Sequence, residues 1–268
     1  PLVGIVVSLV GTFAFMAIAG FSINLHKTLD KIGGKGLFLK ELDAALLAGQ
    51  VDICVHSLKD VPVTENPALP IGAYSVRELP ADVLVLPKGT SHWNPALPVG
   101  CASARRKMQF QQLYPEAVIQ PVRGNVLTRL DKLDSGEYGA LILAEAGLKR
   151  LGLSDRIAYR FSPEELVPAA GQGILAIQTR AGEYADLLAR LNSPDGALCA
   201  KTERQLASLL GGDCSAPVGC HAQLHRTDMT LYGFSGIGGV PRYGSVQGNR
   251  NDADLLVQQL ASKLTITE

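Results

Sequence analysis

The sequence predicts an α/β protein that ends in a smaller α+β part. From residue 33 onward, short apolar runs alternate with stretches of helical periodicity, which is the order that βαβ units with a parallel sheet require. Beyond residue 210, three strand-like runs come before a single helix. The chain has 268 residues, of which 47% are hydrophobic and 19% charged, so it can bury a core and divide into two or three domains.

The α/β part begins with a helix predicted at 36–49. Leu42 and Leu46 fall on one face of this helix, and Gly49 supplies a C-cap. Apolar runs then predict strands at 51–55, 71–75, 83–86, 99–101, 118–121 and 140–144. Helical patterns follow the last three of these strands, at 103–114, 125–133 and 146–151.

The remaining elements complete the α/β part and form the α+β part. A strand at 174–178 is followed by helices at 183–191 and 194–210, the second with Ser193 as N-cap and Pro194 at its first position. The α+β part consists of strands at 222–225, 230–234 and 243–247 and a helix at 252–264.

A glycine-framed loop, residues 211–219, carries Cys214 between a long helix and the strand-rich tail. Glycines before a cysteine allow positive φ and leave room for a bulky adduct, whereas a core cysteine is normally embedded in apolar periodicity. The pattern therefore favours a chemically used thiol, and a structurally inert cysteine is the alternative.

A metal site is a second interpretation of the same region, because Cys214, Cys220, His221 and His225 lie within a dozen residues. Structural zinc usually needs closely spaced cysteine and histidine pairs, which the Cys-x₅-Cys spacing does not provide. The two histidines fit an alternating strand better. We predict no metal site.

Lys59 and Asp60 follow a short apolar strand, and Pro62 prevents the segment from continuing as a helix. In open α/β sheets, ligands bind at the carboxyl edge of the strands, and a lysine beside an acid favours its ionised form. A solvated turn is the alternative interpretation.

Arginines occur at two predicted strand-to-helix junctions, in the segments 101–107 and 123–130. Guanidinium groups and the N–H groups of a helix N-terminus together bind carboxylates or phosphates. An ordinary charged helix face is the alternative at each junction.

The overall charge is balanced, with a net charge of +0 and a pI of about 7.3. No global field therefore draws the protein to nucleic acid or anionic lipid. The five cysteines are an odd number without a framework spacing, which is typical of a reducing compartment.

The first 25 residues contain no charged side chain and are long enough to span a bilayer. No Lys or Arg precedes this stretch, and Gly4, Gly11 and Gly20 interrupt it. We expect a divergent, misread or truncated N-terminus rather than a membrane helix. If the stretch forms a strand, 5–7 and 9–10 are the residues expected to pair in the sheet.

Ordered motifs identify a family resemblance. They occupy 31–42, 56–62, 103–106, 123–130, 146–152, 167–173 and the cysteine loop. The chain resembles the porphobilinogen deaminases, also called hydroxymethylbilane synthases, over residues 31 to about 225. The resemblance implies two α/β domains like those of periplasmic binding proteins plus a small α+β domain with the cysteine loop. It places domain 1 at 1–76 and 169–192, domain 2 at 77–168 and domain 3 at 193–268.

The resemblance also implies the reaction. The family joins four porphobilinogen molecules into hydroxymethylbilane, with release of ammonia, in tetrapyrrole (haem) biosynthesis. Cys214 matches the residue that carries the dipyrromethane cofactor through a thioether, and Asp60 matches the catalytic carboxylate. Loss of ammonia from porphobilinogen leaves an azafulvenium cation, which a nearby carboxylate stabilises.

Further positions match residues that bind these anionic molecules, whose pyrrole rings each carry an acetate and a propionate. By resemblance, the cofactor is held by Lys59, Ser103, Arg105, Arg106 and Arg129. The substrate and the growing chain are contacted by Arg123, Arg150, Gln172, Lys31 and Lys35. The resemblance implies a cytoplasmic monomer that acts on porphobilinogen, with no nucleic-acid or membrane partner.

The sequence departs from the family pattern in three places. The family's Thr-Arg-x-Ser-x-Leu-Ala segment is absent, Ala102 replaces a hydroxyl residue, and Asp213 stands where a glycine often precedes the cysteine. These departures leave two alternatives open: a catalytically impaired relative, and a non-catalytic domain pair that binds an anionic ligand.

Overall fold

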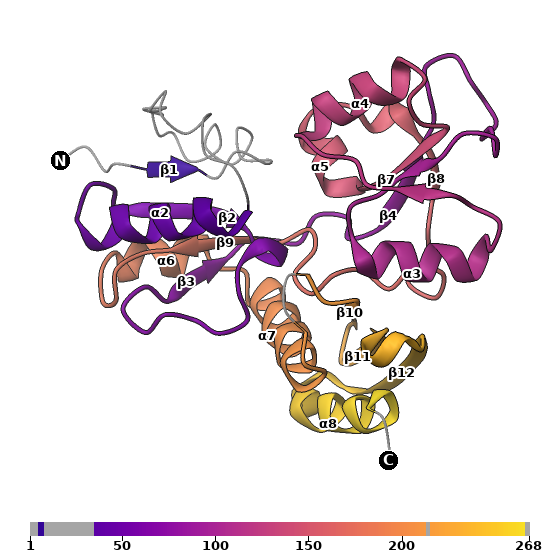
Figure 1. The fold of residues 1–268 in the computed structure, drawn as a ribbon. Helices are drawn as coiled ribbons and strands as arrows, with labels where there is room; N and C mark the ends of the chain where they lie inside the picture. Colours follow the sequence, from indigo (N-terminus) through magenta and orange to yellow (C-terminus); the bar gives the residue numbers. More distant parts are fainter. Residues whose placement is uncertain (1–4, 8–34, 213–214, 266–268) are drawn as a thin grey trace.

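A computed structural model describes residues 5–7, 35–212 and 215–265. These residues form three sheets, of four, five and three strands. Each sheet with its helices makes one lobe, called lobes 1, 2 and 3 in chain order (Figure 1). The predicted combination of α/β parts and a terminal α+β part is confirmed. No helix in the described part of the chain is both long and apolar enough to cross a membrane.

Lobe 1 has the strand order β1-β2-β9-β3. The strands are β1 (Ile5–Val7), β2 (Ile53–Ser57), β9 (Leu175–Gln178) and β3 (Ile71–Tyr74). Strand β1 runs parallel to β2, as expected for 5–7, whereas the expected pairing of 9–10 lies outside the described residues. Strand β9 is antiparallel to both of its neighbours. The sheet is therefore mixed and not parallel as predicted, because the chain re-enters it in the opposite direction.

Helices cover both faces of the lobe 1 sheet. On one face, Leu42 and Leu46 of helix α2 (Lys35–Leu47) pack with Cys54. On the other, Leu188 of helix α6 (Ala185–Leu191) packs with Val55. Strand β2 alternates between two buried surfaces, which explains why its first three residues, Ile53 to Val55, are all apolar.

Lobe 2 has the strand order β6-β5-β7-β4-β8. Its strands are β4 (Asp82–Val85), β5 (Val99–Gly100), β6 (Ile119–Gln120), β7 (Ala140–Ala144) and β8 (Ile157–Arg160). Strands β5, β6 and β7 are parallel as predicted, but β4 is antiparallel to β7 and β8. The sequence did not predict β8, because it is an edge strand with mostly exposed side chains and no apolar run.

Three helices of lobe 2 follow its parallel strands, namely α3 (Ala104–Leu113), α4 (Val126–Asp134) and α5 (Glu145–Arg150). Ser103 caps α3, and Asn125 caps α4 by accepting from the Thr128 N–H at 2.9 Å. Each parallel strand therefore leads into a capped or tightly turned helix start, and these starts face lobe 1.

Lobe 3 is an antiparallel meander of β10 (Val218–His225), β11 (Asp228–Ser235) and β12 (Arg242–Asn249). Helices α7 (Pro194–Leu209) and α8 (Ala253–Leu264) cover one face. The predicted N-cap is confirmed, since the Ser193 hydroxyl accepts from the Gly196 N–H at 3.1 Å. Strand β10 starts four residues earlier than predicted, so Cys220 and His221 lie buried inside it.

Candidate active site

The turn after β2 presents the predicted acid. A short 3₁₀ helix, η2 (Leu58–Asp60), follows the strand directly. Leu58 is buried in the core and anchors the turn, so the two polar residues after it are carried to the sheet edge. The Lys59 ammonium donates to the side-chain oxygen of Gln172 at 3.2 Å.

A cavity of about 150 Å³ lies at this edge, between lobes 1 and 2. We call it the cleft cavity. The predicted site residues that line it are Lys59, Asp60, Arg106, Arg129, Arg150 and Gln172. They come from the η2 turn, from α3, α4 and α5, and from the segment that returns to lobe 1. Residues up to 113 positions apart in the chain thus share one space.

A smaller cavity of about 70 Å³ lies at the junction of the three lobes, and we call it the loop cavity. Lys59, Ser103 and Arg105 line it together with Gly212 and Ala216. The latter two flank residues 213–214, so the loop cavity adjoins the predicted cysteine loop. Lys59 lines both cavities.

Four of the predicted residues are not placed at a cavity. Cys214 and Lys31 lie outside the described residues. Lys35 is the first residue of α2, and its side chain also lies outside the description. Arg123 is exposed on the loop before α4 and lines neither cavity.

The charges around the cleft cavity are unequal. Its described lining contains four cationic side chains, those of Lys59, Arg106, Arg129 and Arg150, and one carboxylate, that of Asp60. Burial lowers the pKa of Arg129 and of Arg150, although a guanidinium remains charged at neutral pH. The cavity therefore suits a ligand with several carboxylates that also brings a positive or polar group to Asp60.

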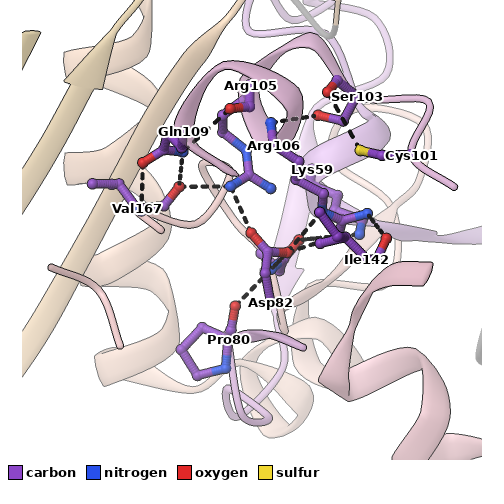
Figure 2. A network of polar contacts seen from close by, with 11 residues as sticks. Lys59, Pro80, Asp82, Cys101, Ser103, Arg105, Arg106, Gln109, Ile142 and Val167 are labelled. Atoms are coloured by element: carbon purple, nitrogen blue, oxygen red, sulfur yellow. Dashed lines mark hydrogen bonds and ion pairs between the residues drawn. The ribbon is translucent and has the colours of Figure 1, made fainter. Parts of the chain in front are cut away.

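A buried acid that the sequence analysis missed organises two of the arginines (Figure 2). Asp82 is fully buried; its carboxylate accepts from Arg105 Nη1 at 2.6 Å and from Arg106 Nε at 2.8 Å. Burial alone would raise the pKa of Asp82, but the guanidinium groups hold it far below its ordinary value. A charged residue directly before the apolar run 83–86 was the available signal.

The described residues offer no metal centre, since no three His, Cys, Asp or Glu side chains among them are grouped to hold an ion. Cys220 and His221 are buried in β10, while His225 is exposed at its end.

Comparison with known proteins decides the family. A family profile described as "Porphobilinogen deaminase, dipyromethane cofactor binding domain" matches residues 16–186, and one described as "Porphobilinogen deaminase, C-terminal domain" matches residues 197–265. The chain belongs to the porphobilinogen deaminase family. The first match begins inside the 25-residue stretch in which no family motif was recognised, so the resemblance starts earlier than residue 31.

Relatives with this name are similar over most of their length. The porphobilinogen deaminase of Acetivibrio thermocellus is 48% identical over 245 residues, which cover 90% of this chain and 82% of the relative. That of Chromobacterium violaceum is 46% identical over 253 residues, covering 90% and 80%. The family's reaction, the joining of four porphobilinogen molecules with release of ammonia, is thus the function of this chain, and the predicted transferase class is confirmed.

The dipyrromethane cofactor of the family fits the residues present. It carries four carboxylates on two pyrrole rings, and both the loop cavity and the cleft cavity are lined by cationic side chains. Membership in the family favours the enzyme over the alternative of a non-catalytic domain pair.

Proposed function

We propose that Asp60 is the catalytic carboxylate of this porphobilinogen deaminase and that Cys214 carries the dipyrromethane. The observation that supports both roles is that Lys59 lines both cavities. One cavity holds Asp60, and the other adjoins the cysteine loop. A group attached to the loop and extending past Lys59 toward Asp60 would meet cationic side chains of both cavities.

The other cysteines support Cys214 as the attachment point. The chain has five cysteines, and the four described ones are buried and free. Burial raises the pKa of Cys54 to about 12 and that of Cys199 to about 11. Such thiols form little thiolate at neutral pH.

Asp60 has the charge that the reaction needs. Loss of ammonia from porphobilinogen leaves a cation delocalised over the pyrrole, and a fixed, partly buried carboxylate stabilises it. The same carboxylate accepts hydrogen bonds from pyrrole N–H groups. The bound dipyrromethane supplies the pyrrole carbon to which the first substrate is joined.

The remaining roles follow the lining of the cavities. We propose that the carboxylates of the cofactor are bound by Lys59, Ser103, Arg105, Arg106 and Arg129. For the substrate and the growing chain we propose Arg123, Arg150, Gln172, Lys31 and Lys35. Arg105 and Arg106 already donate to Asp82, so they have fewer donors left for a ligand than Arg129 and Arg150.

Domain division, cell compartment and oligomeric state belong to the proposal as well. We propose domain 1 at 1–76 and 169–192, domain 2 at 77–168 and domain 3 at 193–268. The strands of lobe 1 come from before and from after lobe 2 in the sequence, which supports this division. Free, buried cysteines support a reducing compartment, the cytoplasm. We further propose a monomer without nucleic-acid partners.

Intact-mass spectrometry tests the central proposal. Protein from a porphobilinogen-producing host should carry the additional mass of two pyrrole units, and Cys214→Ala should lack it. Cys199→Ala is the matched control, because it removes a thiol buried in lobe 3 and should keep the additional mass. Additional mass on Cys214→Ala would exclude this attachment point.

A further inference from the structure

Asp82 is the first residue of β4, directly after the chain has crossed from lobe 1 to lobe 2. Its side chain is completely buried and lines neither the cleft cavity nor the loop cavity. Both carboxylate oxygens are used: Oδ2 accepts from Arg105, and Oδ1 accepts from Arg106 and from the Gln172 amide at 2.8 Å. The acid therefore acts on the site through other side chains.

The two guanidinium groups are held on more than one side. Arg105 Nη1 also donates to the Val167 carbonyl at 2.6 Å, and Arg106 Nη1 donates to the Ile142 carbonyl at 3.2 Å. Only 3% of Arg105 and 8% of Arg106 is exposed. Both long side chains contact the same anion, Asp82 (Figure 2). Asp82 therefore determines which of their N–H groups remain available for a ligand.

Gln172 extends this network across the cleft. Its amide nitrogen donates to Asp82 and to the Pro80 carbonyl at 2.6 Å. Its oxygen accepts from Lys59 Nζ at 3.2 Å and from Arg106 Nη2 at 3.4 Å. An ionised carboxylate only accepts, so Asp82 requires the nitrogen side of the amide and thereby turns the oxygen toward the two cations.

We propose that Asp82 is a positioning residue of the reaction. It sets the two arginine side chains and the direction of the Gln172 amide, and through that amide it fixes the Lys59 ammonium beside Asp60. The inference rests on the proposed roles of Lys59 and Asp60. It assigns catalytic importance to an acid that contacts no ligand space.

Asp82→Asn tests the proposal, since it keeps the shape and removes the charge that orients three side chains. Losing one charge-assisted contact typically costs a factor of about ten or more. We expect kcat per cofactor-loaded chain to fall at least about tenfold, with KM for porphobilinogen changed less than about threefold. Unchanged kcat in loaded chains would overturn the proposal.

A double-mutant cycle with Gln172→Met distinguishes positioning from general destabilisation. If Asp82 acts through the amide, the double variant should lose about as much kcat as the more impaired single variant. Multiplicative losses would overturn the claim that Asp82 acts through Gln172.

Glu145→Gln is the matched control. It removes another buried acid of lobe 2 that pairs with an arginine, Arg160, and we expect unchanged kcat and multiplicative behaviour with Gln172→Met.

A measurement that does not depend on enzyme turnover separates this inference from the proposed function. NMR of arginine Nε–H groups should show Arg106 protected from hydrogen exchange in the wild type and exposed in Asp82→Asn, whether or not the chain carries its cofactor. Equal protection in both would overturn the anchoring role. If Asp82→Asn does not fold, Asp82→Glu retains the charge but displaces the arginines, and wild-type kcat in that variant would likewise overturn the proposal. Wild-type protein without the two-pyrrole mass contradicts the proposed function alone.

Discussion

Arg77 and Glu203 form a bidentate ion pair with N–O distances of 2.5 and 2.9 Å. Arg77 lies on the first crossover, the segment 75–81 that leads from lobe 1 to lobe 2, and Glu203 lies on helix α7. Glu203 is completely buried and also accepts from the backbone N–H groups of Gly171 and Ala222, each at 2.7 Å. Gly171 lies on the second crossover, the segment that returns from lobe 2 to lobe 1, and Ala222 lies in β10. One carboxylate therefore connects both crossovers with the first strand of lobe 3. The cysteine loop begins directly after α7, and its Gly212 lines the loop cavity.

Glu203→Gln should strongly destabilise the protein. Breaking a buried ion pair on one side leaves Arg77 uncompensated and typically costs about 3–5 kcal/mol. Urea unfolding at pH 7 measures the change. Asp195→Asn on the same helix is the control, because its pair with Arg250 is solvent-exposed and should contribute less than about 1 kcal/mol. Equal losses in the two variants would contradict the structural role given to Glu203.

The same carboxylate gives a pH signature. Burial alone would raise the pKa of Glu203, but Arg77 and His221 lower it from 4.5 to about 2. Since the folded-state pKa is the lower one, the stabilisation is fully present above pH 4.5 and is lost as the pH falls toward 2. Wild-type unfolding free energy should therefore decline over this window more steeply than that of Glu203→Gln. Parallel curves for the two proteins would contradict this assignment.

Asp60→Asn should leave the cofactor in place and slow the reaction. The substitution keeps the shape but removes the charge that stabilises the cation, and such groups contribute about 10²–10³ in rate. Porphobilinogen consumption per cofactor-loaded chain is the measurement. Asp131→Asn, on the exposed face of α4, should retain wild-type turnover. Near-normal turnover in Asp60→Asn would assign the role to another residue.

The sequence predicted most of the helices and strands because their apolar periodicity and caps are local. It predicted Lys59, Asp60 and the arginine junctions because strand ends and helix starts meet at one sheet edge. It did not predict Asp82, whose partners Arg105 and Gln172 lie 23 and 90 residues away. Long-range pairing also decides the antiparallel directions of β4 and β9, and these have no local signature.

Arg150 and Arg123 should differ in their effect on substrate binding. Arg150 lines the cleft cavity and donates to the Gly173 carbonyl at 3.3 Å, whereas Arg123 is exposed and lines neither cavity. Arg150→Met should raise KM for porphobilinogen about tenfold through loss of a charge-assisted contact. Arg123→Met should change KM less than about threefold, because from its exposed position we expect Arg123 to contact the growing chain and not the first bound substrate. A larger effect at Arg123 would show that the loop before α4 moves into the cleft when substrate binds.

The reactivity of the thiols tests whether the four described cysteines are buried. The four described thiols are buried, and burial raises the pKa of Cys54 to about 12 and that of Cys220 well above its ordinary value. Thiolate is the reactive form, so these side chains should not react with a thiol reagent at pH 7.5 while the protein is folded.

In Cys214→Ala we therefore expect no rapid reaction before denaturation and four reactive thiols after it. Cofactor-free wild type should show one rapid thiol, and cofactor-loaded wild type none, because a thioether has no thiol. A rapidly reacting thiol in folded Cys214→Ala would contradict the burial of the other cysteines and weaken the argument that singles out Cys214.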